Sequence, residues 1–225
     1  MLQHKDQRTV EAHLYHALAH LKARVGAFDQ AREFATRCRA FYRDTGQQST
    51  FDFFAEMDGD IEMIAGDPAA AERVIRESYD ALRARGEESL NLAAFLARSI
   101  CLQERWDDAE PYATSAASEM GSFFGAIAKG SLARVRAHQG RVGDAEILAR
   151  EAVAQLEGTD FLTDRADILT DAADVLLVAG RAREAADALD LALTLYEQKG
   201  DTVTPPRIRA TLAGIRPATR SRKEA

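Results

Sequence analysis

The 225-residue sequence contains few cysteines and no long apolar segment. Its two cysteines, Cys38 and Cys101, are too few for a disulfide-stabilised scaffold and favour reduced thiols in a cytoplasm. No apolar run reaches the roughly 18 residues that a membrane span requires. The N-terminal stretch MLQHKDQRTVEAH is too polar for a secretory signal. A formal net charge of -7 disfavours nucleic acid or an anionic membrane as the main partner. We therefore expect a cytoplasmic protein that binds neither.

Motifs for catalysis and for cofactor binding are also missing. The sequence has no G-x-x-x-x-G-K-[ST] phosphate loop and no H-E-x-x-H zinc motif. Its serines and threonines form no nucleophile elbow or catalytic triad pattern. The sequence therefore predicts a protein that is not an enzyme and that carries no cofactor.

What the sequence does contain is an internal repeat. The copies begin 40, 38, 36 and 40 residues apart, at Gly26, Gly66, Glu104, Gly140 and Gly180. A repeat of this length indicates a stack of similar supersecondary units. The alanine content, and apolar residues that recur at three- and four-residue steps, indicate that these units are helical.

We interpret each copy as part of an antiparallel helix pair. The predicted pairs cover about 8–46, 47–86, 87–121, 122–158 and 161–200, and a short capping helix covers 205–215. Gly66-Asp67-Pro68 is a strong helix start, because aspartate caps the N-terminus and proline suits the first turn. The prediction is therefore an all-α solenoid over residues 1–215, followed by a disordered basic tail at 216–225.

Three positions in every copy carry a small residue. Seven residues before the repeat start stand Ala19, Gly59, Ala97, Ala133 and Ala173. Five residues after it stand Ala31, Ala71, Ala109, Ala145 and Ala185. Twelve residues after it stand Cys38, Ser78, Ala116, Ala152 and Ala192. Two helix axes approach closely only where the side chains at the crossing are small, so these positions are predicted to set how the helices meet.

These features resemble tetratricopeptide (TPR) repeats. The turns Gly26-Ala27-Phe28 and Glu104-Arg105-Trp106 match the glycine and aromatic that the family favours there. The sequence departs from the family in its longer period, where about 34 residues is usual, and in lacking the early tryptophan and the late proline. The resemblance covers about residues 8–200. It implies a non-catalytic scaffold that binds a peptide or protein segment on its concave face.

Three segments resemble a narrower group. AGDPAAAE, LAREAVAQLEGTD and AADALDLALTLYEQKGD are similar to the C-terminal repeat regions of bacterial signalling ATPases and nucleotide-cyclase regulators. In those proteins the catalytic domains lie upstream of the repeats. The resemblance implies that this chain is an interaction module in bacterial signalling or regulation.

The concave face is predicted from equivalent positions on the first helices of the pairs. The candidate binding residues are His16, His20, Phe53, Glu56, Asp60, Asn91, Arg98, Arg134, Asp167, Thr170 and Asp174. Arg98 and Arg134 lie on adjacent helices and suit a carboxylate or phosphate, because guanidinium groups bind such anions bidentately. The alternative is that they pair with Asp60 and Asp174 along the surface.

A histidine cluster supports a second functional hypothesis. His13, His16 and His20 fall on one stripe of the first helix that is expected to face solvent. His16 and His20, opposite Glu56 and Asp60, can be arranged to hold a divalent metal. The alternative function is thus a metal- or small-molecule-responsive sensor. The simpler interpretation is a solvated polar face.

The first helix also carries an apolar stripe, formed by Val10, Leu14, Leu18, Leu21 and Val25. We expect this stripe to pack within its own hairpin. A solenoid must nevertheless leave one face of a terminal hairpin uncapped, and such a face can form a homodimer.

Overall fold

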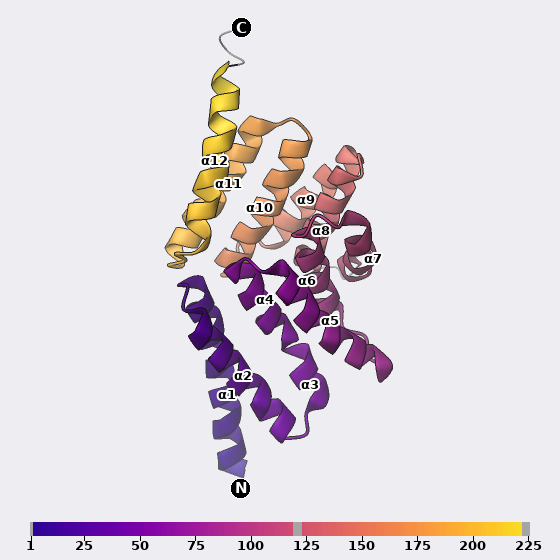
Figure 1. The fold of residues 1–225 in the computed structure, drawn as a ribbon, viewed down its shortest axis with the longest axis vertical. Coiled ribbons are helices and arrows are strands. Elements are labelled where there is room, and N and C mark those ends of the chain that lie inside the picture. The colour runs from indigo at the N-terminus through magenta and orange to yellow at the C-terminus, as the bar shows by residue number, and fades with distance from the viewer. Residues whose placement is uncertain (1, 119–122, 222–225) are drawn as a thin grey trace.

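The computed structural model describes residues 2–118 and 123–221, and the regular elements in these ranges are all helices (Figure 1). Their bounds are α1 Leu2–Arg24, α2 Phe28–Asp44, α3 Gln48–Phe53, α4 Ala55–Ala65, α5 Pro68–Ala84, α6 Leu90–Cys101, α7 Trp106–Ala117, α8 Phe123–His138, α9 Val142–Gln155, α10 Leu162–Val178, α11 Ala182–Gln198 and α12 Thr204–Ser221.

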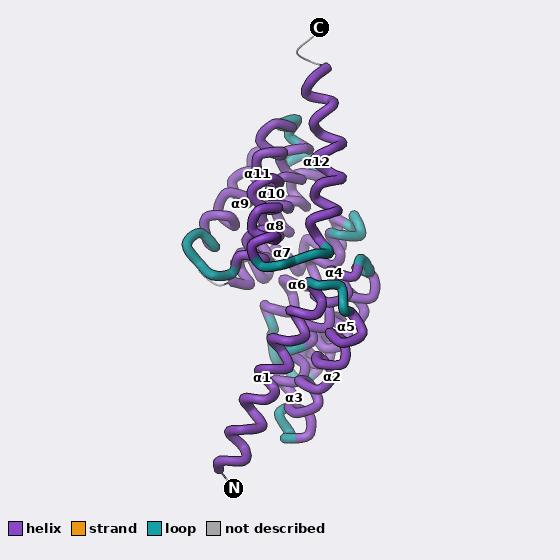
Figure 2. Tube along the Cα trace, turned by 90° about the vertical axis from the view of Figure 1, so that its left-hand side faces the viewer, coloured by secondary structure: helices purple, strands orange, loops and turns teal. Residues whose placement is uncertain are grey.

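The helices form two layers. The inner layer consists of α1, α4, α6, α8 and α10, and each of these helices packs against the next. The outer layer consists of α2, α5, α7, α9 and α11, each packed against its own inner helix. Figure 2 shows the same stack from the side. The prediction of an all-α solenoid of five helix pairs is confirmed.

The turns inside the pairs adopt one backbone conformation. Gly26, Gly66, Gly140 and Gly180 have φ values of 78°, 94°, 81° and 75°. Glu104, which stands at the same place in the third pair, has a φ of 59° and is the one non-glycine residue with positive φ in the described ranges. This left-handed conformation costs an ordinary L-residue free energy but is open to glycine. The repeat therefore specifies a turn geometry, and the third copy adopts it without glycine.

The fifteen small residues are all buried at the helix crossings. Gly59 shows why size matters there, because a Cβ atom at this position would lie 2.3 Å from Cδ1 of Ile75. A side chain at that point would therefore have to displace the buried side chain of Ile75 on α5. The predicted role of these positions in packing is confirmed.

One predicted helix is interrupted. The first helix of the pair predicted at 47–86 divides at Phe54, which lies between α3 and α4. The ring of Phe54 stacks on Tyr42, with centroids 5.0 Å apart, and meets His16 edge-on at 5.1 Å. The break directs this ring toward the core of the first pair. Phe51 also packs against the edge of that core.

The prediction for the apolar stripe of α1 is wrong. Val10, Leu14, Leu21 and Val25 are 58%, 57%, 53% and 44% exposed, and the buried face of α1 is built from alanines such as Ala12. The cause is again the close helix crossing, which admits alanine and excludes leucine. The large residues therefore lie on the outer side of α1, which none of the described helices covers.

The capping helix is present and longer than expected. Ile208, Leu212 and Ile215 of α12 are buried in one cluster with residues of α10 and α11. The helix continues to Ser221, so residues 216–221, expected to be disordered, are helical. The rest of the predicted tail, 222–225, lies outside the described residues. Among the residues that are described, no helix is long and apolar enough to span a bilayer.

The N-terminal end of α12 lies beside the C-terminal end of α1, in the first helix pair (Figure 1). The amide of Thr202 donates a hydrogen bond of 2.9 Å to the carbonyl oxygen of Arg24. The α-carbon of Gly26 faces a methyl group of Val203, which would lie 3.5 Å from a Cβ atom at Gly26. The first and last turns of the chain are therefore in direct contact.

Candidate functional site

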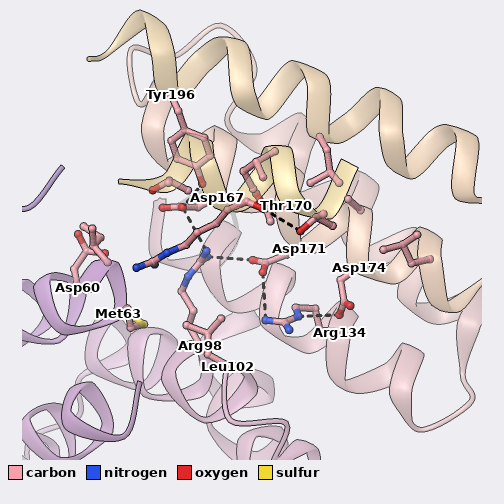
Figure 3. A pocket seen from close by; sticks show the side chains of 18 of the residues that line it. Asp60, Met63, Arg98, Leu102, Arg134, Asp167, Thr170, Asp171, Asp174 and Tyr196 are labelled. Carbon is pink, nitrogen blue, oxygen red and sulfur yellow. Dashed lines mark hydrogen bonds and ion pairs between the residues drawn. The ribbon is translucent and has the colours of Figure 1, made fainter. Parts of the chain in front are cut away.

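A cavity of about 350 Å³ lies between the inner helices and α12 (Figure 3). Six of the eleven predicted binding residues line it: Asp60, Arg98, Arg134, Asp167, Thr170 and Asp174. They come from α4, α6, α8 and α10, four successive helices of the inner layer. Met63, Leu177 and Ile208 give the cavity an apolar side. Equivalent positions on consecutive helices thus converge on one site, as a repeat requires.

Arg98 and Arg134 are held by aspartates of α10. Nη1 of Arg98 lies 3.1 Å from Oδ2 of Asp171, and its Nη2 lies 3.7 Å from Oδ1 of Asp167. Nε of Arg134 donates to Oδ2 of Asp174 at 2.9 Å, and its Nη1 lies 3.6 Å from the other oxygen of Asp171. Figure 3 shows this alternating row of charges. Each guanidinium is therefore already engaged by two carboxylates.

The arrangement corrects part of the expected pairing. Arg134 does pair with Asp174, but Arg98 pairs with Asp171 and Asp167 instead of Asp60. The pairs are also not surface pairs, because both arginine side chains are only 13% exposed. Burial lowers the pKa of Arg98, but the charges of Asp171 and Asp167 outweigh it and raise the pKa. Both arginines remain charged, and neither is free for an incoming anion.

Arg24 extends the row to α1 and joins it to the end of the chain. Its Nη2 lies 3.1 Å from Oδ2 of Asp167 and 4.0 Å from Oδ2 of Asp60, and its Nη1 lies 3.3 Å from Oδ2 of Asp201. The other oxygen of Asp201 accepts the amides of Val203 and Thr204 at the start of α12. One arginine thus holds two inner helices and the capping helix together.

The charge balance of this row is negative. Three arginines, at 24, 98 and 134, face five aspartates within 4.0 Å: Asp60, Asp167, Asp171, Asp174 and Asp201. The row thus holds two more carboxylates than guanidinium groups. The cavity itself is balanced, because Arg207 of α12 also lines it and the fully buried Asp201 does not. Asp164 is a further carboxyl group near the row. Burial and the charges of Asp167 and Asp60 raise its pKa to about 6.

Histidines flank the row at both ends. Nδ1 of His20 lies 3.2 Å from Oδ2 of Asp60, and its Nε2 lies 3.3 Å from Nε2 of His16. Burial, together with the charges of His20 and His13, lowers the pKa of His16 to about 4, so His16 is neutral at pH 7. The histidine stripe was expected to face solvent. His13 is exposed as expected, but His16 and His20 are partly buried.

At the other end, His138 contacts the same aspartate as Arg134. Its Nε2 lies 3.1 Å from Oδ2 of Asp174, and its ring stacks on Trp106 with centroids 3.9 Å apart. The guanidinium of Arg134 also lies over the Trp106 ring, at 5.4 Å. The aromatic turn residue of the third pair therefore supports the ionic row from the outside.

Besides His16 and His20, three more predicted residues do not line the cavity. Glu56 is buried beside Cys38, and its Oε2 has no hydrogen-bond partner; burial raises its pKa to about 8. Asn91 is also buried, accepts a hydrogen bond from Ser89 and donates one of 3.4 Å to the carbonyl of Phe53. Phe53 itself is 38% exposed. The described residues contain no group of three or more histidine, cysteine or acidic side chains that can hold a metal ion.

Sequence reasoning missed several members of the row, namely Arg24, His138, Asp171, Tyr196 and Asp201. The spacing of Asp167, Asp171 and Asp174, four and three residues apart, places all three on one face of a helix and was a usable signal. Tyr196 donates a 2.5 Å hydrogen bond to Asp167 from α11. Nothing in the repeat pattern indicates that contact, nor the return of Asp201 to Arg24.

Comparisons with known proteins identify the fold. No family model and no curated protein matches the chain. Among solved structures it is similar to TTC0263, a thermophilic TPR protein of Thermus thermophilus, with 17% identity over 94% of this chain and 98% of that one and a TM-score of 0.57. It is also similar to pilF of Pseudomonas aeruginosa, with 12% identity over 92% and 90% and a TM-score of 0.55.

A third similar structure is a putative kinesin light chain of Podosopora anserina with nearly identical TPR-like repeats. It shares 17% identity over 84% of this chain and 95% of that one, with a TM-score of 0.53. At these identities the likeness concerns the fold alone. The chain is therefore a TPR-like helical solenoid.

Proposed function

We propose that the protein is a non-catalytic scaffold that binds a segment of a partner protein in the cavity between the inner helices and α12. The observation that carries this proposal is the convergence of six predicted concave-face residues, from four inner helices, on one cavity of about 350 Å³. A cavity of this size accommodates one or two side chains of a peptide. Concave surfaces of helical repeats are the usual place for extended partners.

The charges favour a segment with a basic side chain. The sequence alone suggested that Arg98 and Arg134 await a carboxylate or phosphate, but both are engaged by Asp171 and its neighbours. An incoming anion would have to break these buried ion pairs, which is costly. A lysine or arginine of the partner would instead share Asp174, which contacts Arg134 and His138 but is 30% exposed, while its methylene groups lie along Leu177.

We further propose a cytoplasmic role in bacterial signalling or regulation. The resemblance of the three sequence segments to repeat regions of bacterial regulators supports the context. Cys38 and Cys101 are free and buried, as expected for thiols used for packing in a reducing compartment. These supports are independent of the cavity, so the context and the binding site can be tested separately.

The binding site is tested by filling it. Thr170 lines the cavity, and its hydroxyl donates to the carbonyl of Ala166 at 2.9 Å. Thr170→Trp places an indole in the cavity. Thr194 of α11 is a matched control, because it is exposed and donates the same type of hydrogen bond, to Asp190 at 3.0 Å. Peptides selected from a random display library on the wild-type protein should bind Thr194→Trp unchanged and Thr170→Trp at least about tenfold more weakly.

The same peptides test the charge argument. Selected sequences should share a lysine or arginine, and its replacement by glutamine should weaken binding by about tenfold. Equal binding to Thr170→Trp and wild type, with both proteins folded by circular dichroism, would remove the cavity from the proposal. Selection of acidic peptides would show that the buried arginines open to anions, contrary to the argument above.

A further inference from the structure

The outer face of α1 presents an apolar stripe that the fold leaves uncovered. α1 packs against α2 and α4 through its opposite side, where the alanines are buried. On a helical projection, six apolar residues fall within an arc of about 100°: Ala17, Val10, Leu21, Leu14, Val25 and Leu18. Four of these six are between 44% and 58% exposed. Such a stripe at one end of a solenoid is the surface on which a further helix would stack.

The order of residues along the stripe is symmetric. Val10 and Val25 are equidistant from the midpoint between Ala17 and Leu18, and so are Leu14 and Leu21. When two copies of α1 lie antiparallel across a two-fold axis through this midpoint, valine meets valine and leucine meets leucine. At the axis Leu18 lies beside Leu18 of the other copy at one edge of the stripe, and Ala17 lies beside Ala17 at the other edge. A helix of another protein would have no reason to match this symmetry.

Charged residues beside the stripe select the same orientation. Glu11 and Lys22 project from the same flank, about 20° apart on the projection. In the antiparallel pairing, Glu11 of one copy and Lys22 of the other lie on one side of the interface, about 3 Å apart along the helix axis. In a parallel pairing in register, Glu11 of one copy and Lys22 of the other would lie on opposite sides of the interface and could not pair. We propose that the protein forms an antiparallel homodimer through α1, with Leu14 packed on Leu21 of the second copy.

The dimer is expected to be reversible. The stripe extends over about 22 Å of helix, and a contact of that length is smaller than the roughly 800 Å² per partner of a standard stable interface. Sedimentation equilibrium should therefore show a monomer–dimer transition within the micromolar range. This association is independent of the cavity, because α1 presents the stripe on its outer side.

Cross-linking with a short bismaleimide tests the register. Cys38 and Cys101 are fully buried, so the wild-type protein serves as the unreacted control. Ala17→Cys should cross-link to itself, since its two copies lie beside the axis. Val10→Cys should not, because its copies lie about 22 Å apart, but a mixture of Val10→Cys and Val25→Cys should. Self-linking of Val10→Cys without the mixed product would overturn the antiparallel arrangement.

Substitutions test the interface itself. Leu14→Glu should weaken dimerisation by about tenfold or more, whereas Leu191→Glu, at a leucine of α11 that is 42% exposed, should not. Lys22→Glu should also weaken the dimer, and Glu11→Lys combined with it should restore the association. Circular dichroism melting verifies that each variant is folded. A wild-type protein that stays monomeric to several hundred micromolar, or a dimer that Leu14→Glu leaves intact, would refute the proposal.

Discussion

The side chain of Arg24, near the start of the chain, holds the carboxylate of Asp201, near its end, at 3.3 Å. The carboxylate is completely buried and the arginine side chain is 10% exposed. The same guanidinium holds Asp167 of α10, so it links three segments that are distant in sequence. The ends of this solenoid are thus joined by a buried charge network, whereas the contacts within the repeats are made mainly between small apolar residues.

Replacement of Arg24 should open this junction. Arg24→Met keeps most of the side-chain volume but leaves Asp201 and Asp167 without their shared cation in a buried place. Removal of one partner from a buried ionic network costs about 3–5 kcal/mol. We expect a loss of unfolding free energy of this order in urea denaturation, together with faster hydrogen exchange at the amide of Thr202.

Arg32→Met is the matched control. Arg32 also pairs with a carboxylate, that of Glu62, but its side chain is 46% exposed, so water screens the pair and the loss should be below about 1 kcal/mol. If the two substitutions cost the same, the junction at Arg24 contributes no more than a surface ion pair.

The repeated features of the structure were predictable because the same residue types recur at the same positions in each copy. The small residue at Gly59 is explained by its contact with Ile75, and the same requirement recurs at four other crossings. The glycine at four of the five turns indicates a positive φ directly. Local geometry that is imposed several times leaves a pattern that one sequence suffices to reveal.

The features that occur once were not predictable in this way. Asp201 contacts Arg24 only because the whole stack curves enough to bring the last turn to the first, and that curvature is the sum of small rotations between pairs. The stripe at Leu14 was assigned to the core because its spacing is that of a buried helix face. In a terminal pair the same spacing marks the face that a neighbour would have covered, so periodicity alone could not decide.

Glu56 should make stability depend on pH. Burial raises its pKa to about 8, above the usual value near 4.5, so between these values the folded protein holds a proton that the unfolded chain releases. Its contribution to the unfolding free energy is therefore retained at low pH and lost as pH rises toward 8. Glu56→Gln removes this dependence. The variant should gain about 2–4 kcal/mol relative to wild type between pH 5 and pH 8, measured by denaturation at both values.

Glu33→Gln provides the comparison for Glu56. Glu33 is 57% exposed and pairs with Arg37 on the same helix, so its loss should change stability little and about equally at both pH values. A Glu56→Gln variant whose gain is the same at pH 5 and pH 8 would show that Glu56 titrates normally in the folded protein.

Replacement of Glu104 should increase the stability of the protein. It has the left-handed φ of 59° that glycine adopts at the other four turns, and this conformation costs an L-residue about 1–2 kcal/mol. Glu104→Gly removes that cost but adds the greater backbone entropy of an unfolded glycine, so we expect a net gain of about 0.5–1 kcal/mol in unfolding free energy.

Glu104→Ala separates the two effects, because it removes the carboxylate, keeps the Cβ atom and should give no gain. The reverse change, Gly180→Ala, should lose a similar amount, although no atom beyond the neighbouring residues of the chain lies within 4 Å of the new Cβ position. If Glu104→Ala stabilises the protein as much as Glu104→Gly, the benefit comes from removing the charge and the turn carries no strain.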